Sequence, residues 1–227
     1  MKQSLFTMEH ARQLTADTYE LVLSGDTSAI TAPGQFVNIQ LPGKFLRRPI
    51  SICNWTKDAL LLLVRVVGEG THDLVRCVPG TELDVLSGLG NGFDLAKGGA
   101  HPILLGGGIG IAPLYGLAQR MLEAGIAPTV GLGFRSGGDA FYLEEFGKLG
   151  CRLMVATEDG SLGTKGFVTD LARHVPECGY AFVCGPTPML KAVHGLPQLT
   201  GGQFSFEARM GCGFGACLVC ACALKSE

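Results

Sequence analysis

The pattern of apolar and turn-forming residues changes near residues 96–100, and this change limits the folds that the chain can adopt. Before it, short segments of β-branched or alternating residues are separated by glycine–proline turns such as Pro33-Gly34 and Pro42-Gly43. After it, apolar segments of strand length alternate with segments of helical character. Closely spaced short strands favour a small antiparallel barrel. Strand–helix alternation favours a parallel sheet covered by helices. The sequence therefore predicts two domains in this order.

The expected elements follow from this division. In the first part we expect strands at residues 19–23, 35–40, 60–67 and 81–86. In the second part we expect strands at 102–105, 129–134, 152–157 and 180–184, and helices at 113–124, 140–149, 168–174 and 188–193. From about Gly202 the sequence shows no periodicity. The predicted division is residues 1–98 for the antiparallel barrel, 99–203 for the α/β domain and 204–227 for a short C-terminal segment.

That last segment contains the most specific pattern in the chain. Four of the nine cysteines lie within eleven residues, at Cys212, Cys217, Cys220 and Cys222. The spacing Cys-x4-Cys-x2-Cys of the first three is that of plant-type ferredoxins, in which thiolates hold a [2Fe–2S] cluster. Zinc sites usually take two close pairs separated by a longer insert, and the segment has no second pair and no neighbouring histidine. We therefore predict that Cys212, Cys217 and Cys220 are iron ligands.

A second pattern, Gly-Gly-Gly-Ile-Gly-Ile-Ala-Pro at residues 106–113, follows a predicted strand and opens a predicted helix. A phosphate-binding loop has this placement, since glycines permit close approach and the helix start carries partial positive charge. A proline is well tolerated in the first turn of a helix. A glycine loop alone would be equally compatible with a tight turn. Its placement favours a nucleotide site made by Gly106, Gly107, Gly108, Ile109, Gly110 and Pro113.

A third pattern is Arg48-Pro49-Ile50-Ser51. Arginine can bind a pyrophosphate with two parallel hydrogen bonds, although a surface arginine before a strand would look the same.

Two further sets of residues leave alternatives open. Arg135 is either a solvated loop residue or a contact to a ribose or phosphate. The segment that starts at Glu158 is either a polar turn or a loop near the nucleotide.

Composition excludes several functions. The net charge is −2 with no basic stripe, so a nucleic-acid partner is not expected. The apolar runs are too short to span a bilayer, so no membrane association is expected. The first twenty residues carry charges throughout and do not resemble a signal peptide. We therefore expect a cytoplasmic protein, in which clustered cysteines indicate metal or iron–sulfur ligation rather than disulfides.

Four of these motifs occur in a recognisable order: residues 48–51, Gly70-Thr71, the glycine loop and Cys184-Gly185-Pro186. In this order they resemble the ferredoxin–NADP reductase superfamily, whose members pair an FAD-binding barrel with a nucleotide-binding α/β domain. Residues 88–93 and the cysteine-rich stretch 207–217 narrow the resemblance. With them, nearly the whole chain is similar to the electron-transfer subunits of type B dihydroorotate dehydrogenases.

The resemblance implies a role for each motif. The FAD site would comprise Arg48, Pro49, Ile50, Ser51, Leu63, Val64, Arg65, Gly70 and Thr71. The glycine loop would face NAD(H), and Cys184, Gly185 and Pro186 would lie near the nicotinamide ring. The three cysteines would hold the [2Fe–2S] cluster. Relatives take their fourth ligand from a cysteine further downstream. Here it would be Cys222 or, as we expect, a cysteine beyond residue 227.

The resemblance also implies a function in pyrimidine biosynthesis. Electrons from an FMN-containing dihydroorotate dehydrogenase catalytic subunit would pass through the cluster and FAD to NAD+, within a heterotetramer. No residue stands out as a catalytic acid or base, as expected for a protein that positions redox groups. Two alternatives stay open. One is a reductase subunit of another complex, of the hydrogenase or transhydrogenase type, and the other is a non-enzymatic redox sensor.

Overall fold

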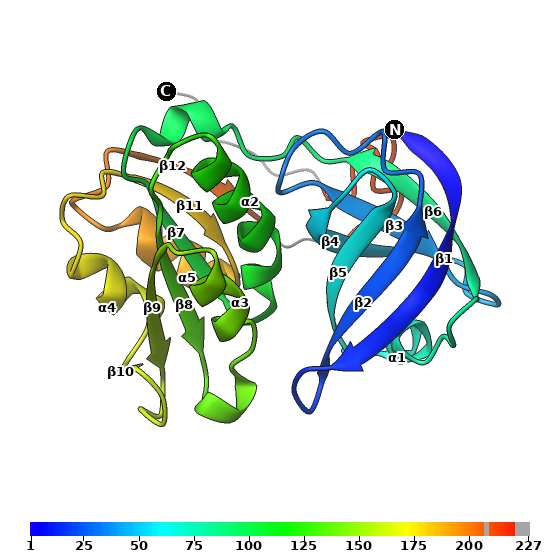
Figure 1. Cartoon of the computed structure of the whole chain (residues 1–227), viewed down its shortest axis with the longest axis horizontal. Helices are drawn as coiled ribbons and strands as arrows, with labels where there is room; N and C mark the ends of the chain where they lie inside the picture. The colour runs from blue at the N-terminus through cyan, green and yellow to red at the C-terminus, as the bar shows by residue number, and fades with distance from the viewer. Residues whose placement is uncertain (207–208, 221–227) are drawn as a thin grey trace.

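The computed structural model describes residues 1–206 and 209–220. Its chain forms a closed six-stranded antiparallel barrel followed by a six-stranded parallel sheet, and the two lie side by side (Figure 1). The predicted fold class, a barrel followed by a parallel-sheet domain, is confirmed. The predicted domain boundaries stay a prediction. Strand β12 (Gly201–Ser205) is part of the parallel sheet and includes residues on both sides of position 203.

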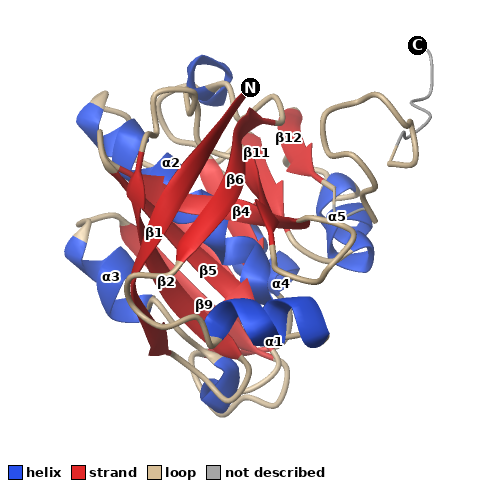
Figure 2. Ribbon diagram, turned by 90° about the vertical axis from the view of Figure 1, so that its right-hand side faces the viewer, coloured by secondary structure: helices blue, strands red, loops and turns tan. Residues whose placement is uncertain are grey.

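The barrel is closed in the order β1-β2-β5-β4-β3-β6, with β6 pairing back to β1. Alternate side chains point inward, so that Phe6 and Met8 of β1 and Leu21 and Leu23 of β2 are fully buried in its core. The helix α1 (Glu69–Val75) lies at one end of the barrel and contributes Leu74 to the same core (Figure 2). The strands are β1 (Lys2–Gln13), β2 (Thr18–Gly25), β3 (Phe36–Gln40), β4 (Arg48–Trp55), β5 (Ala59–Arg65) and β6 (Glu82–Leu89).

The parallel sheet has helices on both faces. Its strands are β7 (Ile103–Gly107), β8 (Thr129–Phe134), β9 (Arg152–Thr157), β10 (Thr164–Lys165), β11 (Tyr180–Cys184) and β12. Its helices are α2 (Ala112–Glu123), α3 (Leu143–Lys148), α4 (Val168–Arg173) and α5 (Thr187–His194). Successive side chains of β7 point to opposite faces of the sheet and so belong to different hydrophobic cores. Leu104 packs in one core with α2 and α3, whereas Ile103 and Leu105 pack in the other with α4 and α5.

The strand order is β10-β9-β8-β7-β11-β12. The chain therefore moves outward from β7 to β10 and then returns to the other side of β7. A reversal of this kind opens a crevice at the carboxyl ends of the two central strands, which is where open α/β sheets bind their ligands. Here the crevice lies between the ends of β7 and β11, and it places the glycine loop next to Cys184.

The structure differs from the sequence-based expectation in several elements, among them β4 and β10, which fall outside the predicted strand ranges. Strand β1 and helix α1 were not predicted, and α3 is shorter than the predicted helix at 140–149. No strand was predicted at residues 201–205, but β12 pairs with β11 along its whole length. A Cβ at Gly202 would lie 2.9 Å from the carbonyl oxygen of Ala181, so the glycine permits close strand pairing at a position with little β propensity.

Strand β4 packs directly against helix α2, and this contact joins the barrel to the sheet. A Cβ at Gly116 would lie 2.6 Å from the carbonyl oxygen of Cys53, so the backbones meet closely. Asn54 Nδ2 donates to Gln119 Oε1 at 2.7 Å. The guanidinium of Arg120 lies 4.3 Å from the centre of the Trp55 ring. These contacts fix the two halves of the molecule against each other.

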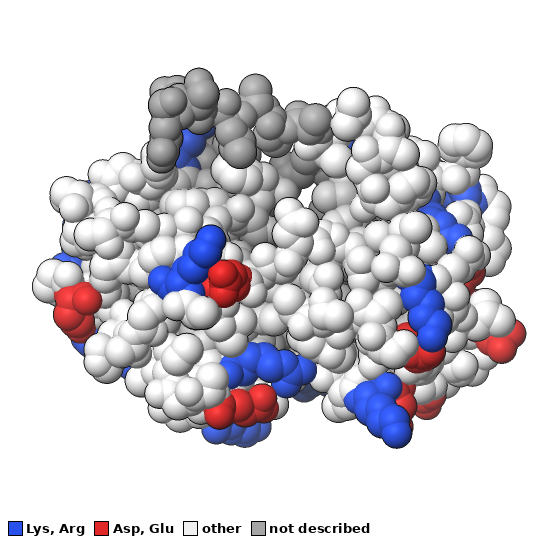
Figure 3. All heavy atoms as spheres, turned by 90° about the horizontal axis from the view of Figure 1, so that it is seen from above, with Lys and Arg blue, Asp and Glu red and all other residues white. Residues whose placement is uncertain are grey.

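The face seen from above carries basic and acidic side chains beside one another (Figure 3). Ion pairs of this kind occur in the described part of the chain, such as Arg47 with Asp84 at 2.8 Å. None of the described helices has the length and apolar character needed to cross a bilayer.

Candidate functional site

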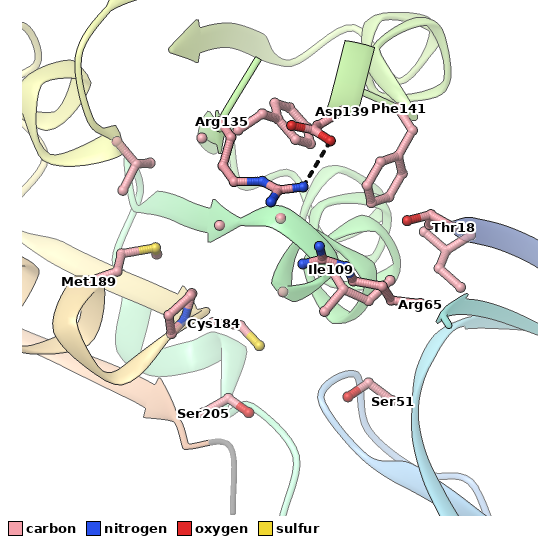
Figure 4. Close-up of a pocket in the computed structure, with 18 of the residues that line it drawn as sticks. Thr18, Ser51, Arg65, Ile109, Arg135, Asp139, Phe141, Cys184, Met189 and Ser205 are labelled. Atoms are coloured by element: carbon pink, nitrogen blue, oxygen red, sulfur yellow. Dashed lines mark hydrogen bonds and ion pairs between the residues drawn. The ribbon is translucent and has the colours of Figure 1, made fainter. Parts of the chain in front are cut away.

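A cavity of about 960 Å³ lies between the barrel and the carboxyl edge of the parallel sheet (Figure 4). Barrel residues such as Ser51 and Arg65 form one wall, and Ile109, Cys184 and Met189 form another. Thirteen of the predicted cofactor-binding residues line it: Pro49, Ile50, Ser51, Leu63, Val64, Arg65, Thr71, Gly107, Gly108, Ile109, Gly110, Cys184 and Pro186. Segments far apart in the sequence therefore meet at one site, at the switch point of the sheet.

The glycine loop is held against the neighbouring loop after β11. A Cβ at Gly110 would lie 2.4 Å from the carbonyl oxygen of Cys184, and one at Gly107 would lie 2.5 Å from Met189 Sδ. Gly108 has φ +54°, which favours glycine. Close packing therefore explains Gly107 and Gly110, and backbone conformation explains Gly108.

Three predicted residues of this region support the loop without lining the cavity. A Cβ at Gly106 would lie 2.8 Å from Ile111 Cγ2, so Gly106 packs under the loop. Pro113 is buried in the first turn of α2. Gly185 lies next to Met189, whose sulfur would be 2.8 Å from a Cβ there.

On the barrel side, an ion pair forms part of the cavity wall. Arg65 Nε lies 2.8 Å from Asp17 Oδ2, and both residues line the cavity together with Thr18. Burial raises the pKa of Asp17, but hydrogen bonds from Arg65 and from two threonine hydroxyls outweigh burial, so its pKa lies below the ordinary value. Asp17 is therefore a carboxylate at neutral pH and holds Arg65 in place.

Arg48 lies against Gly70, and neither residue forms part of the cavity wall. A Cβ at Gly70 would lie 1.8 Å from Arg48 Nε, so the guanidinium stem occupies the space above the glycine. Arg48 also donates to the carbonyl oxygen of Leu46. The next residue, Thr71, does line the cavity, and its hydroxyl accepts the backbone N–H of Val67 at 2.9 Å. The arginine therefore stands beside the cavity, with donors available for an anionic group.

The described part of the cysteine segment packs on the barrel. Asn38 Nδ2 donates to the carbonyl oxygen of Cys212 at 3.2 Å. A Cβ at Gly213 would lie 2.7 Å from the same amide nitrogen and 3.5 Å from the ring of Phe36. Phe36 also lines the cavity, so one side chain contacts both the cavity and the cysteine segment.

Cys212 and Cys217 are brought together by reciprocal hydrogen bonds. The backbone N–H of each residue donates to the sulfur of the other, both at 3.4 Å. Backbone N–H groups of Cys217 and Phe214 lower the pKa of the Cys212 thiol to about 6. Two sulfurs that each accept a backbone N–H suit an iron–sulfur cluster, whose properties depend on such hydrogen bonds.

Cys220 follows in the same loop, but the described residues include no group of three or more metal-ligating side chains gathered at one point. The structure thus brings two of the three predicted ligands together. Cys222 lies outside the described residues.

Several cavity residues were not assigned from the sequence. Arg135 and Glu158, which were left between two interpretations, both line the cavity directly after β8 and β9. Their position at the carboxyl ends of parallel strands is the signal that could have found them. Most of the others are apolar or come from loops and carry no such signal: Asp17, Thr18, Phe36, Phe134, Asp139, Phe141, Met189 and Met210.

Known proteins are similar to this chain in sequence. A family model described as an oxidoreductase NAD-binding domain matches residues 104–195. The chain is 42% identical, over 99% of its length, to the dihydroorotate dehydrogenase B (NAD(+)) electron transfer subunit of Shouchella clausii, and the match covers 90% of that protein. The protein of the same name from Listeria monocytogenes is 40% identical over 98% of this chain and 90% of its own length. The chain belongs to this family.

Solved structures agree with membership of the dihydroorotate dehydrogenase B electron transfer subunit family. The structure of an NADH-dependent reduced ferredoxin-NADP oxidoreductase matches with a TM-score of 0.85 and 29% identity, over 96% of this chain and 81% of that one. A ferredoxin NADP+ reductase from Neisseria gonorrhoeae with bound FAD and NADP matches with a TM-score of 0.75, over 91% of this chain and 100% of that one. At 14% identity the second match shows the fold alone. The resemblance seen in the sequence is confirmed.

Proposed function

We propose that this chain is the electron-transfer subunit of an NAD+-dependent dihydroorotate dehydrogenase and that it uses FAD and a [2Fe–2S] cluster. One observation carries the proposal beyond family membership. A single cavity reaches from β4 and β5 of the barrel to the glycine loop and Cys184, and Phe36 connects that cavity to the cysteine segment. Three redox groups must lie close together for electrons to pass among them, and this arrangement would allow their proposed sites to do so.

The barrel wall fits a flavin dinucleotide. Pro49, Ile50 and Ser51 of β4 and Leu63, Val64 and Arg65 of β5 offer apolar surface, backbone groups and a few polar atoms, as ligand cavities usually do. Arg48, Gly70 and Thr71 would hold the pyrophosphate, since the glycine leaves space for the guanidinium. When bound, FAD would accept or donate electrons singly or in pairs, which lets it join a one-electron cluster to a two-electron nicotinamide.

The sheet wall fits NAD(H). Gly106, Gly107, Gly108, Ile109, Gly110 and Pro113 would place backbone N–H groups and a helix start beside the phosphates. Cys184, Gly185 and Pro186 would border the nicotinamide, because they lie at the end of β11 on the other side of the switch point. The chain's own task there is to bind and orient the ring against the flavin, and no acid or base is required.

For the cluster, we propose Cys212, Cys217 and Cys220 as ligands, with a fourth ligand that is not Cys222. The hydrogen-bonded pair Cys212 and Cys217 supports the first two assignments. We further assign residues 1–98 to FAD, 99–203 to NAD and 204–227 to the cluster. The pairing of β12 with β11 would place the start of the third segment at the edge of the sheet.

The name of the family implies a catalytic partner. We propose that the partner is an FMN-containing dihydroorotate dehydrogenase subunit, that two such pairs form a heterotetramer, and that the assembly works in the cytoplasm. Dihydroorotate gives up two electrons and two protons to become orotate. NAD+ takes both electrons and one proton, and the second proton goes to water.

The flavin released by heating the purified chain tests the proposal. Chromatography should show FAD, and the purified protein should reduce an artificial dye with NADH faster than with NADPH at equal concentration. FMN as the sole flavin, or no NADH-dependent dye reduction by flavin-loaded protein, would contradict the proposal.

A further inference from the structure

Arg135 stands where an α/β dinucleotide site recognises the adenosine ribose. It follows β8 directly, and β8 is the strand that comes after the glycine loop and its helix. At this place an acidic residue typically accepts the ribose 2′-hydroxyl of NAD, whereas an arginine accommodates the 2′-phosphate of NADP. Arg135 lines the cavity. Taken alone, it would favour NADP(H), in conflict with the function proposed above.

A neighbouring carboxylate already holds this guanidinium. Arg135 Nη2 lies 3.1 Å from Asp139 Oδ1, and Figure 4 shows the two groups facing each other at the cavity. The second carboxylate oxygen accepts a hydrogen bond from Ser136 Oγ at 3.0 Å. Asp139 is the less exposed partner, at 33% of its side chain against 65% for Arg135. Arg135 therefore lines the cavity while its guanidinium is paired with the Asp139 carboxylate.

The loop that carries Asp139 is anchored by the loop that follows β9. The backbone N–H of Gly137 donates to Ser161 Oγ at 2.7 Å, and that hydroxyl donates to Asp159 Oδ1 at 2.6 Å. Glu158 lines the cavity, and its N–H donates to the carbonyl oxygen of Phe134 at 3.1 Å. This corner of the cavity thus contains two carboxylates, from Asp139 and Glu158, and one guanidinium.

We propose that Asp139 is the residue that selects NAD(H) over NADP(H). Its carboxylate occupies the guanidinium of Arg135 and repels a 2′-phosphate, while a carboxylate oxygen can accept a hydrogen bond from a free 2′-hydroxyl. The coenzyme class is therefore a nicotinamide dinucleotide without a 2′-phosphate. This inference rests on the proposed function, since it concerns the same cavity.

The test replaces Asp139→Asn, which keeps the side chain's shape and removes its charge. We expect the ratio of kcat/KM for NADPH to that for NADH in dye reduction to rise about tenfold, because a charge repulsion at contact distance is lost and Arg135 is released. Calorimetric titration should show a similar gain in affinity for 2′,5′-ADP and a change below about threefold for 5′-ADP.

Two further variants make the test specific. Glu177→Gln removes a carboxylate from an equivalent exposed pair, Arg152 with Glu177 at 3.2 Å, outside the cavity, and should leave both ratios unchanged. Adding Arg135→Ala to Asp139→Asn should abolish the gain, because the released arginine is what would bind the phosphate.

An unchanged ratio in Asp139→Asn would overturn the inference, as would a gain that persists without Arg135. The ADP titrations require no turnover. A protein that cannot use NADH would therefore refute the proposed function, while the titrations would still decide the role of Asp139.

Discussion

Arg48 and Gly70 illustrate what a single residue contributes to the cofactor site. They lie 22 residues apart in sequence, yet the guanidinium stem of Arg48 fills the space where a side chain at position 70 would be. The glycine is therefore required by close approach. Its backbone conformation is not in the left-handed region, so flexibility is not the reason.

This contact predicts that two different substitutions give one result. Arg48→Ala should weaken FAD retention by about 1.5–3 kcal/mol, because a hydrogen bond to a charged group is lost. Gly70→Ala should also weaken it, because the added Cβ displaces the arginine. Fluorescence of released FAD during dilution measures the effect. Arg76→Ala, at the end of the same helix, is the matched control and should retain FAD normally. Full retention in Arg48→Ala would contradict the assignment.

The cysteines predict a contrast in iron content. Cys212→Ser and Cys217→Ser should each lower bound iron and remove the visible absorbance of a [2Fe–2S] cluster, because each loses a thiolate ligand. Cys220→Ser should do the same. Cys222→Ser should leave iron content and absorbance unchanged. Loss of the cluster in Cys222→Ser, or its survival in Cys212→Ser, would show that the ligand set is wrong.

Between elements, a buried polar contact joins the barrel to the start of α3. Arg12 of β1 donates to both carboxylate oxygens of Glu20 at 3.0 Å, and Tyr142 Oη donates to Glu20 Oε2 at 2.6 Å. Tyr142 has φ +65°, which is uncommon for a residue with a side chain. Phe141, its neighbour, lines the cavity. The contact therefore positions part of the cavity wall relative to the barrel.

Glu20 gives this contact a pH dependence. Burial raises the pKa of Glu20, but hydrogen bonds from Arg12 and Tyr142 outweigh burial and lower it below its ordinary value of 4.5. A lowered pKa in the folded state stabilises the protein at pH values above 4.5, and this stabilisation is lost as the pH falls through the lowered value. Glu20→Gln should therefore unfold at a lower temperature than wild type at pH 7, and the difference should shrink below pH 4.5. A constant difference across this range would contradict the assignment.

Tyr142→Phe removes one donor from the same carboxylate. It should lower the free energy of unfolding by about 1–3 kcal/mol, because a buried acceptor loses a partner. Thermal unfolding at pH 7 measures this cost. Tyr19→Phe, a hydroxyl removed from the half-buried face of β2, serves as the control and should have a smaller effect. Equal losses of unfolding free energy in the two variants would show that the hydrogen bond from Tyr142 to Glu20 does not stabilise the fold.

The elements missed from the sequence have physical explanations. Strand β1 exposes most of its polar side chains. Only two of its side chains, Phe6 and Met8, are completely buried, so its apolar periodicity is weak. Helix α1 begins beside Gly68 and Gly70, which normally indicate a turn. Its start is held by Thr71, whose hydroxyl accepts N–H groups of the preceding residues. Both elements also depend on partners distant in sequence, since β1 pairs with β6 and α1 packs Leu74 into the barrel core, and a local pattern cannot reveal such partners.

At the scale of the whole molecule, the order of the barrel and the sheet was predictable because each has its own hydrophobic period. The glycine loop and the end of β11 were also predictable, since both follow apolar strands. The full set of residues that lines the cavity was not predictable from the sequence. The cavity draws on residues from Asp17 to Met210, and its shape depends on the packing of β4 on α2, where Gly116 meets Cys53. No local spacing encodes that contact.

The proposed role is tested most directly by mixing this chain with an FMN-containing dihydroorotate dehydrogenase subunit and following NADH formation from dihydroorotate and NAD+. We predict NADH formation at a steady rate only when both chains are present. This chain alone should reduce a dye with NADH and should not oxidise dihydroorotate. Dihydroorotate oxidation by this chain in isolation, or no NADH formation by the assembled pair, would contradict its role as the electron-transfer subunit.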